Sequence, residues 1–310
     1  MYRIEAPIQQ ATDQALAASA EVASFEAPKI YHAFQNQRMN FTAFSRGFSY
    51  RSENAELMFK AMSYLPDRFT GVDIGSGNGL GAQLVKGMTD IFLRRVIMWN
   101  IDPDPYALRQ AWKDTPNSRR FKAYWIEGFG QDVESLLKGQ MPEEGVDMVS
   151  MLDDVHEFPP DDQFPIIRAG ARILKPGGIM VMNSQFTDIA TAENRAEWSL
   201  PAARAAMKFG KITKAEQPGL LQRAPAEYTQ MGEDAGLEQV YYMVADVLYP
   251  TQALVDINRY PGYVEGVRRS FVFEKGQPSL EELSRELQLT YGRSKPLSRK
   301  SARWIFIKPE

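Results

Sequence analysis

Val72-Asp73-Ile74-Gly75-Ser76-Gly77-Asn78-Gly79 is the stretch that decides the fold of this chain. It starts as an apolar run, ends in three alternating glycines and leads into a helical pattern that begins near Leu80. A glycine has no Cβ, so a ligand can approach its backbone closely, and the first turn of a helix offers unpaired N–H groups. The stretch therefore predicts a strand, a glycine-rich loop and a helix that together hold a nucleotide-like cofactor.

Short apolar runs and helical patterns alternate from the glycine loop onward. The expected strands are residues 69–75, 94–102, 121–128, 146–152, 178–184, 237–245 and 302–309. The expected helices begin near Leu80 and cover residues 106–113, 133–137, 161–174 and 227–235. Strands that alternate with helices form right-handed βαβ units around a parallel sheet. The pattern therefore predicts an α/β, Rossmann-like fold.

Two stretches interrupt this alternation, residues 186–226 and 248–300, and residues 1–65 precede it. We expect a helical N-terminal cap over 1–65 and a main domain over 66–310 that carries the two insertions. Together these segments could roof a pocket at the strand ends.

Helices are expected near residues 192–209 and 280–289 of the insertions. The cap is rich in aromatic residues, which form either a buried helical stripe or part of a pocket lining. They are Tyr31, Phe34, Phe41, Phe44, Phe48 and Tyr50.

The amino-acid composition argues against several classes of protein and of site. The 310 residues include 36 Lys and Arg against 39 Asp and Glu, a net charge of −3 that argues against a dedicated nucleic-acid binder, although a local basic patch stays open. The chain has no cysteine, which excludes disulfides, a thiol nucleophile and cysteine-based zinc sites. No apolar run of about 18 residues and no secretory signal are visible. We expect a soluble cytoplasmic protein with a small-molecule substrate and without a nucleic-acid or membrane partner, and a homodimer is compatible with the sequence.

Two carboxylates distinguish between the cofactors that a glycine loop can bind. Asp73 ends the first strand just before the glycines, where it would repel a pyrophosphate and attract an ammonium group. Asp102 ends the second strand, where a carboxylate can accept hydrogen bonds from ribose hydroxyls. This pair favours adenosylmethionine over a nicotinamide dinucleotide. Either acid could instead be only a turn residue.

Five segments then resemble the class I S-adenosylmethionine-dependent methyltransferases, over roughly residues 65–245 and the last strand. They are DIGSGNG (73–79), NIDPDPYAL (100–108), VDMVSMLDDVHEF (146–158), RILKPGGIMVM (172–182) and EYTQMGEDAGLEQV (227–240). The resemblance implies a seven-stranded, mostly parallel sheet with an antiparallel last strand. It also implies S-adenosyl-L-methionine as the cofactor.

By position, the resemblance assigns Asp73 and the loop residues Gly75, Ser76, Gly77, Asn78 and Gly79 to the methionine part. Asp102 and Pro103 would hold the ribose, Gly128 and Phe129 would cover the adenine, and Leu152 would line the site. The family often has an acid soon after the third strand, whereas this chain has EGFGQD, so Gln131, Asp132 or backbone groups would bind the adenine amine. Phe129 could equally be an ordinary core ring.

His156 is the candidate catalytic base, because it follows the fourth strand and a histidine can accept a proton near neutral pH. The alternative is that it only packs the loop. His32 is expected to be structural. Asp153 and Asp154 are poorly placed to share a metal ion, since neighbouring side chains on an extended chain point to opposite sides. One of them could bind a cationic acceptor.

Two groups of cations have open roles. Arg51, ahead of the core, could meet the cofactor carboxylate or be a solvated loop residue. The basic cluster before the last strand is expected to form a solvated face, or else to bind an anion. Its members are Arg293, Lys295, Arg299, Lys300 and Arg303.

The sequence thus predicts methyl transfer to a small-molecule acceptor by in-line displacement, with no metal. Methyltransferases that act on DNA adenine or on protein glutamine have an N/D-P-P-Y motif after the fourth strand. This chain has LDDV there, which argues against both activities. Three alternatives remain: a lyase or cyclase that uses the cofactor without consuming it, a nicotinamide-dependent oxidoreductase, and a non-catalytic partner protein.

Overall fold

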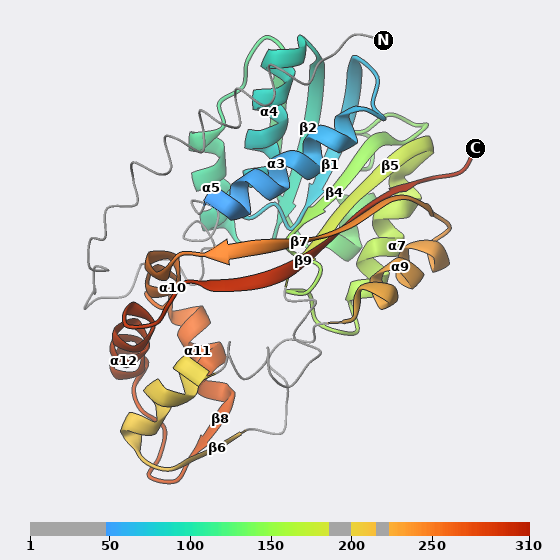
Figure 1. Cartoon of the computed structure of the whole chain (residues 1–310). Coiled ribbons are helices and arrows are strands. Elements are labelled where there is room, and N and C mark those ends of the chain that lie inside the picture. The colour runs from blue at the N-terminus through green and yellow to red at the C-terminus, as the bar shows by residue number, and fades with distance from the viewer. Residues whose placement is uncertain (1–47, 186–199, 215–222) are drawn as a thin grey trace.

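Seven strands form one mixed sheet in the order β3-β2-β1-β4-β5-β9-β7 (Figure 1). The computed structural model describes residues 48–185, 200–214 and 223–310. The strands are β1 (Arg68–Ile74), β2 (Arg95–Asp102), β3 (Phe121–Glu127), β4 (Val146–Leu152), β5 (Leu174–Gln185), β7 (Glu238–Tyr249) and β9 (Leu297–Ile307). The first five strands run parallel, and β9 lies antiparallel between β5 and β7. The predicted fold class is confirmed.

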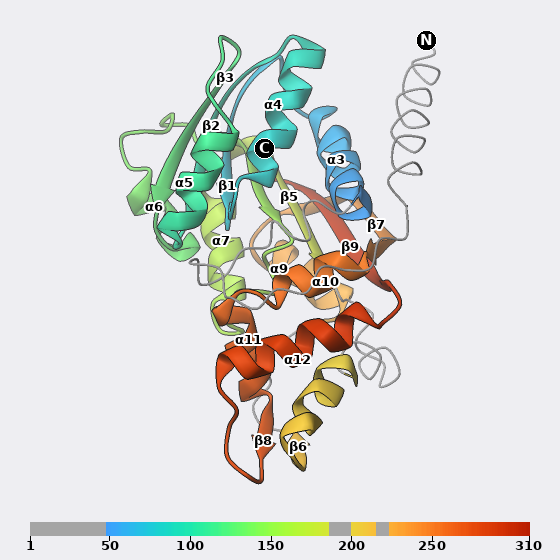
Figure 2. The same cartoon turned by 90° about the vertical axis from the view of Figure 1, so that its left-hand side faces the viewer.

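Helices cover both faces of the sheet (Figure 2). They are α3 (Phe48–Met62), α4 (Leu80–Phe92), α5 (Pro105–Asp114), α6 (Val133–Leu136), α7 (Gln163–Ile173) and α9 (Pro225–Asp234), with a 3-10 turn η1 (Gly130–Asp132). Leu57 of α3 and Val85 of α4 belong to one buried core, and Ile167 of α7 and Tyr228 of α9 belong to another. Every residue of β4 is buried, as expected for a central parallel strand covered on both sides.

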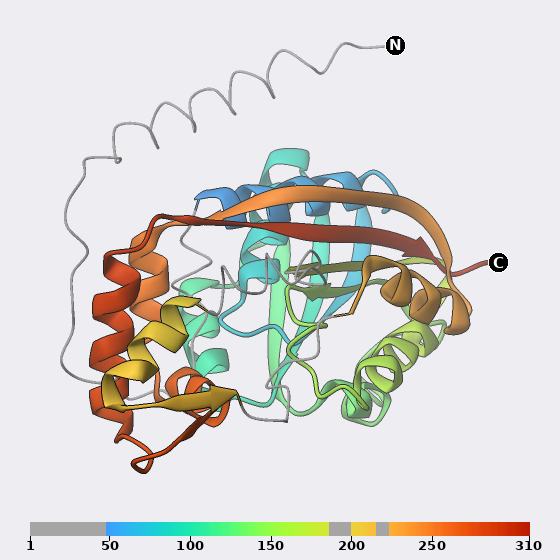
Figure 3. The ribbon, with the colours of Figure 1, turned by 60° about the horizontal axis from the view of Figure 1, so that its bottom comes forward.

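The two interruptions of the alternation contribute to one additional body, here called the insertion unit (residues 200–214 and 250–296). It contains a helical segment 200–206, η2 (Met207–Phe209), β6 (Ile212–Lys214), α10 (Thr251–Ile257), α11 (Pro261–Arg269), β8 (Phe271–Phe273) and α12 (Leu280–Gly292). Strands β6 and β8 pair antiparallel, which joins the two insertions although they are distant in sequence. Figure 3 shows the unit beside the sheet, where β7 and β9 extend into it.

The insertion unit has its own core, with Leu254, Val264, Leu283 and Leu287 buried together. Helix α12 begins with a capping box, in which Ser279 Oγ accepts a hydrogen bond from the Glu282 backbone N–H while the Glu282 carboxylate accepts one from the Ser279 N–H. The partly buried Leu80 packs against this core and against the core under α4. The unit therefore reaches the residue that directly follows the glycine loop.

Several expected boundaries differ from the observed ones. Helix α7 ends at Ile173 and β5 starts at Leu174, earlier than the strand expected from 178. Strands β7 and β9 extend into the range assigned to the second insertion, because they pair with each other from Glu238–Ile307 to Tyr249–Leu297. The short strands β6 and β8 and the helices α10 and α11 had no clear sequence signal. The division into a cap and a main domain stays a prediction.

Some expectations fall outside the described residues. These are Tyr31, His32, Phe34, Phe41 and Phe44, the side chains of Phe48 and Tyr50, and the expected helix over 192–199. Within the described residues, no helix is long and apolar enough to cross a membrane.

Candidate active site at the glycine loop

The glycine loop connects β1 to α4 and is held against the end of β2. The backbone N–H groups of Gly75 and Ser76 both donate to the Ile101 carbonyl, at 2.9 and 3.0 Å. Gly75, Gly77 and Gly79 all have positive φ angles, of 71°, 50° and 82°. Side chains rarely adopt this conformation, so the loop requires glycine for its path.

Close packing constrains two further positions of this turn. A Cβ on Gly79 would lie 2.9 Å from the side chains of Ala111 and Trp125. A Cβ on Gly81, in the first turn of α4, would lie 2.5 Å from Asp73 Oδ2. The helix can therefore approach the end of β1 only because its third loop glycine and Gly81 have no side chains.

Asp73 and Asp102 lie at the ends of adjacent strands, as predicted. Asp73 is buried and accepts a hydrogen bond from Ser150 Oγ of β4 at 2.5 Å. Burial raises the pKa of Asp73 to about 7; the Ser150 bond opposes this rise, and the nearby Asp102 charge adds to it. The backbone N–H groups of Gly77 and Asp104 each donate to Asp102 at 2.8 Å, one to each carboxylate oxygen.

The Gly77 bond ties one oxygen of the Asp102 carboxylate to the glycine loop, and the Asp104 bond ties the other to the turn after β2. Burial raises its pKa, and these two bonds oppose that rise. Each oxygen keeps a second lone pair for another donor. Asp102 can therefore accept further hydrogen bonds, and Pro103, which follows it, is exposed.

Asp154 is a third carboxylate at this edge of the sheet. A Cβ on Gly75 would lie only 2.8 Å from the Asp154 carboxyl group, so this side chain rests directly on the glycine loop. Burial raises its pKa well above the usual range, and the charges of Asp73 and Asp102 raise it further. Sequence reasoning had linked Asp154 to a metal or a cationic acceptor but not to the loop.

The neighbouring Asp153 has a different environment. Its two carboxylate oxygens accept hydrogen bonds at 2.7 Å from the side-chain amides of Asn54 and Asn183. The Asp153 backbone adopts a positive φ of 60°, and its N–H donates to Asn183 Oδ1. Asp153 therefore fixes the loop after β4 against α3 and β5, while Asp154 points at the glycines. Within the described residues, no group of three or more His, Asp or Glu side chains is arranged to hold a metal ion.

The segment after β3 lies beside Asp102, because the Gly128 N–H donates to the Asp102 carbonyl at 3.2 Å. The Phe129 ring is 56% exposed, so its interpretation as a core ring is wrong. Gln131 and Asp132 are also exposed, in η1. Leu152, the last residue of β4, is buried.

Helix α3 approaches the loop from the other side. The Arg51 guanidinium donates to Gln83 Oε1 at 3.4 Å, and Gln83 Nε2 donates to the Asn78 carbonyl at 3.3 Å. This chain of contacts places the exposed Arg51 at the rim of the glycine loop. The structure therefore brings together Asp73, Asp102, Asp154, Arg51 and the loop glycines.

His156 contacts Ser184 of β5 and its neighbour Glu157. Its ring is 3% exposed, with Nδ1 3.3 Å from Ser184 Oγ and Nε2 3.4 Å from Glu157 Oε1. The imidazole thus has a polar neighbour at each nitrogen. Its role as a base stays a prediction.

The basic cluster is not one solvated face, which corrects the expectation. Arg299 and Arg303 are 2% and 1% exposed. Arg303 of β9 forms ion pairs with Glu53 at 3.3 Å and Glu56 at 3.0 Å, both on α3. Alternate residues of a strand point to opposite faces, so a run of cations there is divided between interior and surface.

The residues around the glycine loop are chemically compatible with an adenosylmethionine-like group. Ser76 Oγ is buried in the loop and has no hydrogen-bond partner among the described residues. The loop glycines have no side chains that would shield the backbone from a ligand, and the carboxyl groups of Asp73 and Asp154 lie beside the loop. Residues 72–182 match the family model of a methyltransferase domain. Over these residues the chain is similar to methyltransferase domains.

Solved structures show the same fold around these residues. A candidate methyltransferase from Bacillus halodurans is 16% identical and superposes with a TM-score of 0.52, over 84% of this chain and 100% of that chain. The YcgJ protein from Bacillus subtilis is 15% identical, with a TM-score of 0.51 over 84% of this chain and 99% of that one. No curated protein matches the chain.

Proposed function

We propose that this chain binds S-adenosyl-L-methionine at the glycine loop and transfers its methyl group to a small-molecule acceptor. The observation that carries the proposal is the convergence of Asp73, Asp102 and Asp154 on the bare loop backbone. A pyrophosphate would meet three carboxylates there, whereas the methionine ammonium and the sulfonium are cations. The geometry thus supports the sulfonium cofactor over a dinucleotide.

Each residue then has a distinct task. Asp102 would accept hydrogen bonds from the ribose hydroxyls, and Asp73 and Asp154 would stabilise the methionine ammonium. The Ser76 hydroxyl and the loop N–H groups would bind the polar parts of the same moiety, and Arg51 would pair with its carboxylate. Gly128 and Phe129 would cover the adenine, and Leu152 would form part of the apolar floor.

When bound, the cofactor supplies an electrophilic methyl group, so the protein has mainly to align the acceptor with it. The insertion unit would cover a small acceptor bound beside the glycine loop. Its core packs against the partly buried Leu80, the residue that directly follows the loop. Burial raises the pKa of Tyr263 on α11 well above its usual range, and the charge of Glu157, in the loop after β4, raises it further. His156, in that loop, would accept a proton if the acceptor must lose one.

Calorimetric titration tests this proposal. The wild-type chain should bind S-adenosyl-L-methionine at one site and should not bind NADH. Asp102→Ala should weaken binding by about 1–3 kcal/mol, because charged hydrogen bonds to the ribose are lost. His156→Gln is the matched control, which should keep the cofactor affinity and lower only turnover.

Binding of NADH without binding of the sulfonium would overturn the cofactor assignment. A methyl-labelled cofactor offered to a panel of phenols, amines and carboxylic acids then tests transfer. Label that stays on the cofactor while an acceptor is converted would indicate a cyclase or lyase instead.

A further inference from the structure

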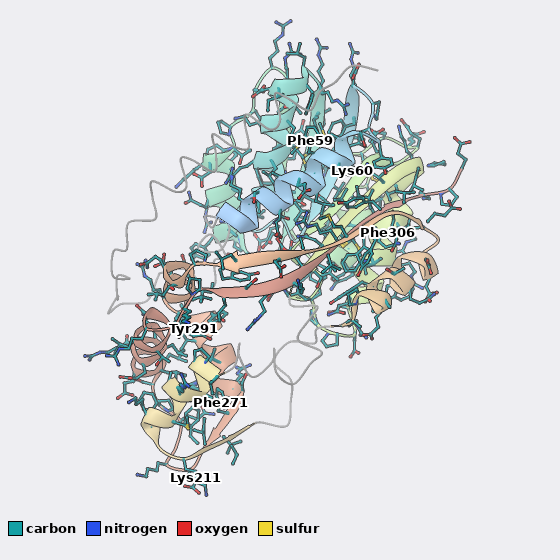
Figure 4. The ribbon with its side chains drawn as sticks, in the orientation of Figure 1. Phe59, Lys60, Lys211, Phe271, Tyr291 and Phe306 are labelled. Carbon is teal, nitrogen blue, oxygen red and sulfur yellow. The ribbon has the colours of Figure 1, made fainter. Side chains whose placement is uncertain are left out.

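A second cleft lies on the insertion unit, between the helical segment 200–209 and the end of α12. It has a volume of about 810 Å3, and no residue of the glycine loop lines it. Figures 1 and 2 show these two segments at the end of the molecule opposite α4, and Figure 4 labels Tyr291 on α12 close by. Any ligand of this cleft is therefore bound by a different set of residues from the cofactor.

Four cations line the cleft: Arg204, Lys208, Arg293 and Lys295. Arg204 and Lys208 are four residues apart and so lie on one side of their segment, and the other pair follows α12. No carboxylate lines the cleft among the described residues. Four like charges that share one concave surface repel each other, and an anion would relieve that repulsion.

These four side chains form no hydrogen bond or ion pair with any described residue. Four other cations of the insertion unit do have acidic partners. Lys211 pairs with Glu274 at 3.1 Å, Arg268 and Arg269 both pair with Glu265, and Arg259 is 4.0 Å from Asp256. The four cleft cations thus differ from these four paired cations of the same unit, in having no acidic partner among the described residues.

The rest of the lining is mainly apolar, with two hydroxyls. Leu200, Met207, Pro296 and Leu297 contribute carbon surface, and Thr290 and Ser294 contribute hydroxyl groups. Small-molecule sites typically combine an apolar wall with a few charged groups, in volumes of roughly 300–1,000 Å3. Arginine also binds phosphate and carboxylate oxygens in pairs.

We propose that this cleft binds a small organic oxyanion, a phosphate- or carboxylate-bearing molecule with an apolar portion. The unpaired cations select the anionic group and the apolar wall binds the remainder. The proposal does not depend on methyl transfer, because none of the cleft residues belongs to the glycine loop.

Octyl phosphate is the probe, titrated into the full-length chain by calorimetry below its micellar concentration. It should bind with a 1:1 stoichiometry, more tightly than inorganic phosphate, and octyl glucoside should not bind. The double variant Arg293→Gln/Lys295→Gln should lose at least about tenfold in affinity, because two charged hydrogen-bond donors are removed. Arg204→Gln/Lys208→Gln should show a similar loss from the opposite wall.

The matched control is Lys211→Gln/Arg269→Gln, which removes the same charge from cations of the same unit that already have acidic partners. This control should keep the wild-type affinity. An equal loss in the control, tight binding of octyl glucoside, or no binding of octyl phosphate would overturn the proposal. All of the altered side chains are exposed, and a thermal melt checks that each variant folds.

Discussion

Carboxylates gather at the carboxyl edge of the sheet, whereas cations gather on the insertion unit. Asp73, Asp102 and Asp154 surround the glycine loop, and the pKa of each is raised by burial. The cations of the insertion cleft are exposed and have no acidic partner among the described residues. A net charge of −3 averages over both regions and reveals neither. The two regions thus suit ligands of opposite charge within one chain.

The two regions also use arginine differently. In the sheet, Arg303 is buried and neutralises Glu53 of α3, whereas Arg293 at the cleft is exposed. A buried arginine has a structural role, because a charge removed from water must be paired with an opposite charge of the protein. Exposure leaves it available for a ligand.

Replacing Arg303 should give the largest effect. Arg303→Ala leaves the buried Glu53 without its cation and should lower the free energy of unfolding by about 3–5 kcal/mol. Lys300→Ala, which breaks the exposed pair with Asp246 between β9 and β7, should cost only about 0–1 kcal/mol. Urea denaturation measures both variants. Similar losses in the two would show that Arg303 does not act as a buried ion-pair partner.

Replacing Leu287 tests whether the two regions are separable. Leu287→Ala removes a fully buried side chain from the insertion core and should lower the free energy of unfolding by about 2–5 kcal/mol. It should leave the affinity for S-adenosyl-L-methionine close to wild type and weaken octyl phosphate binding, because α12 carries one wall of the cleft. Thermal melts and the two titrations measure these effects. A loss of sulfonium affinity with octyl phosphate binding intact would reverse the assignment of sites to regions.

The pH dependence of cofactor affinity should give the smallest effect. Because the pKa of Asp73 is about 7, its carboxyl group is mostly neutral at pH 6 and mostly ionised at pH 8. Only the ionised form attracts the methionine ammonium, so affinity should rise by roughly tenfold over this range, about 1.4 kcal/mol. Binding should also release protons, which titration in buffers of different ionisation enthalpy detects.

Asp73→Asn is the control. Titration of the ligand's own groups affects its binding to the variant and to the wild type equally, whereas the variant has no titrating group at position 73. The difference between the wild-type and variant profiles isolates Asp73. An equally steep rise in the variant would assign the titration to another group.

The sequence alone determined the fold class. Alternating apolar runs and helical patterns are local signals, and hydrophobic periodicity identifies an element without reference to its neighbours. The glycine loop and the strand-end acids Asp73 and Asp102 were readable for the same reason, because turn chemistry and strand ends are encoded within a few residues. The resemblance to methyltransferases then added the seven-stranded sheet with its antiparallel last strand, whereas the strand order came from the structure.

Only the tertiary structure decided which distant residues meet. Asp154 rests on Gly75 because β4 lies next to β1, and Ser150 bonds to Asp73 because their strands pair at that register. The burial of Arg303 and the cation cleft depend in the same way on segments far apart in the chain. Periodicity describes one element at a time, whereas charge pairing and pocket formation depend on how several elements pack together.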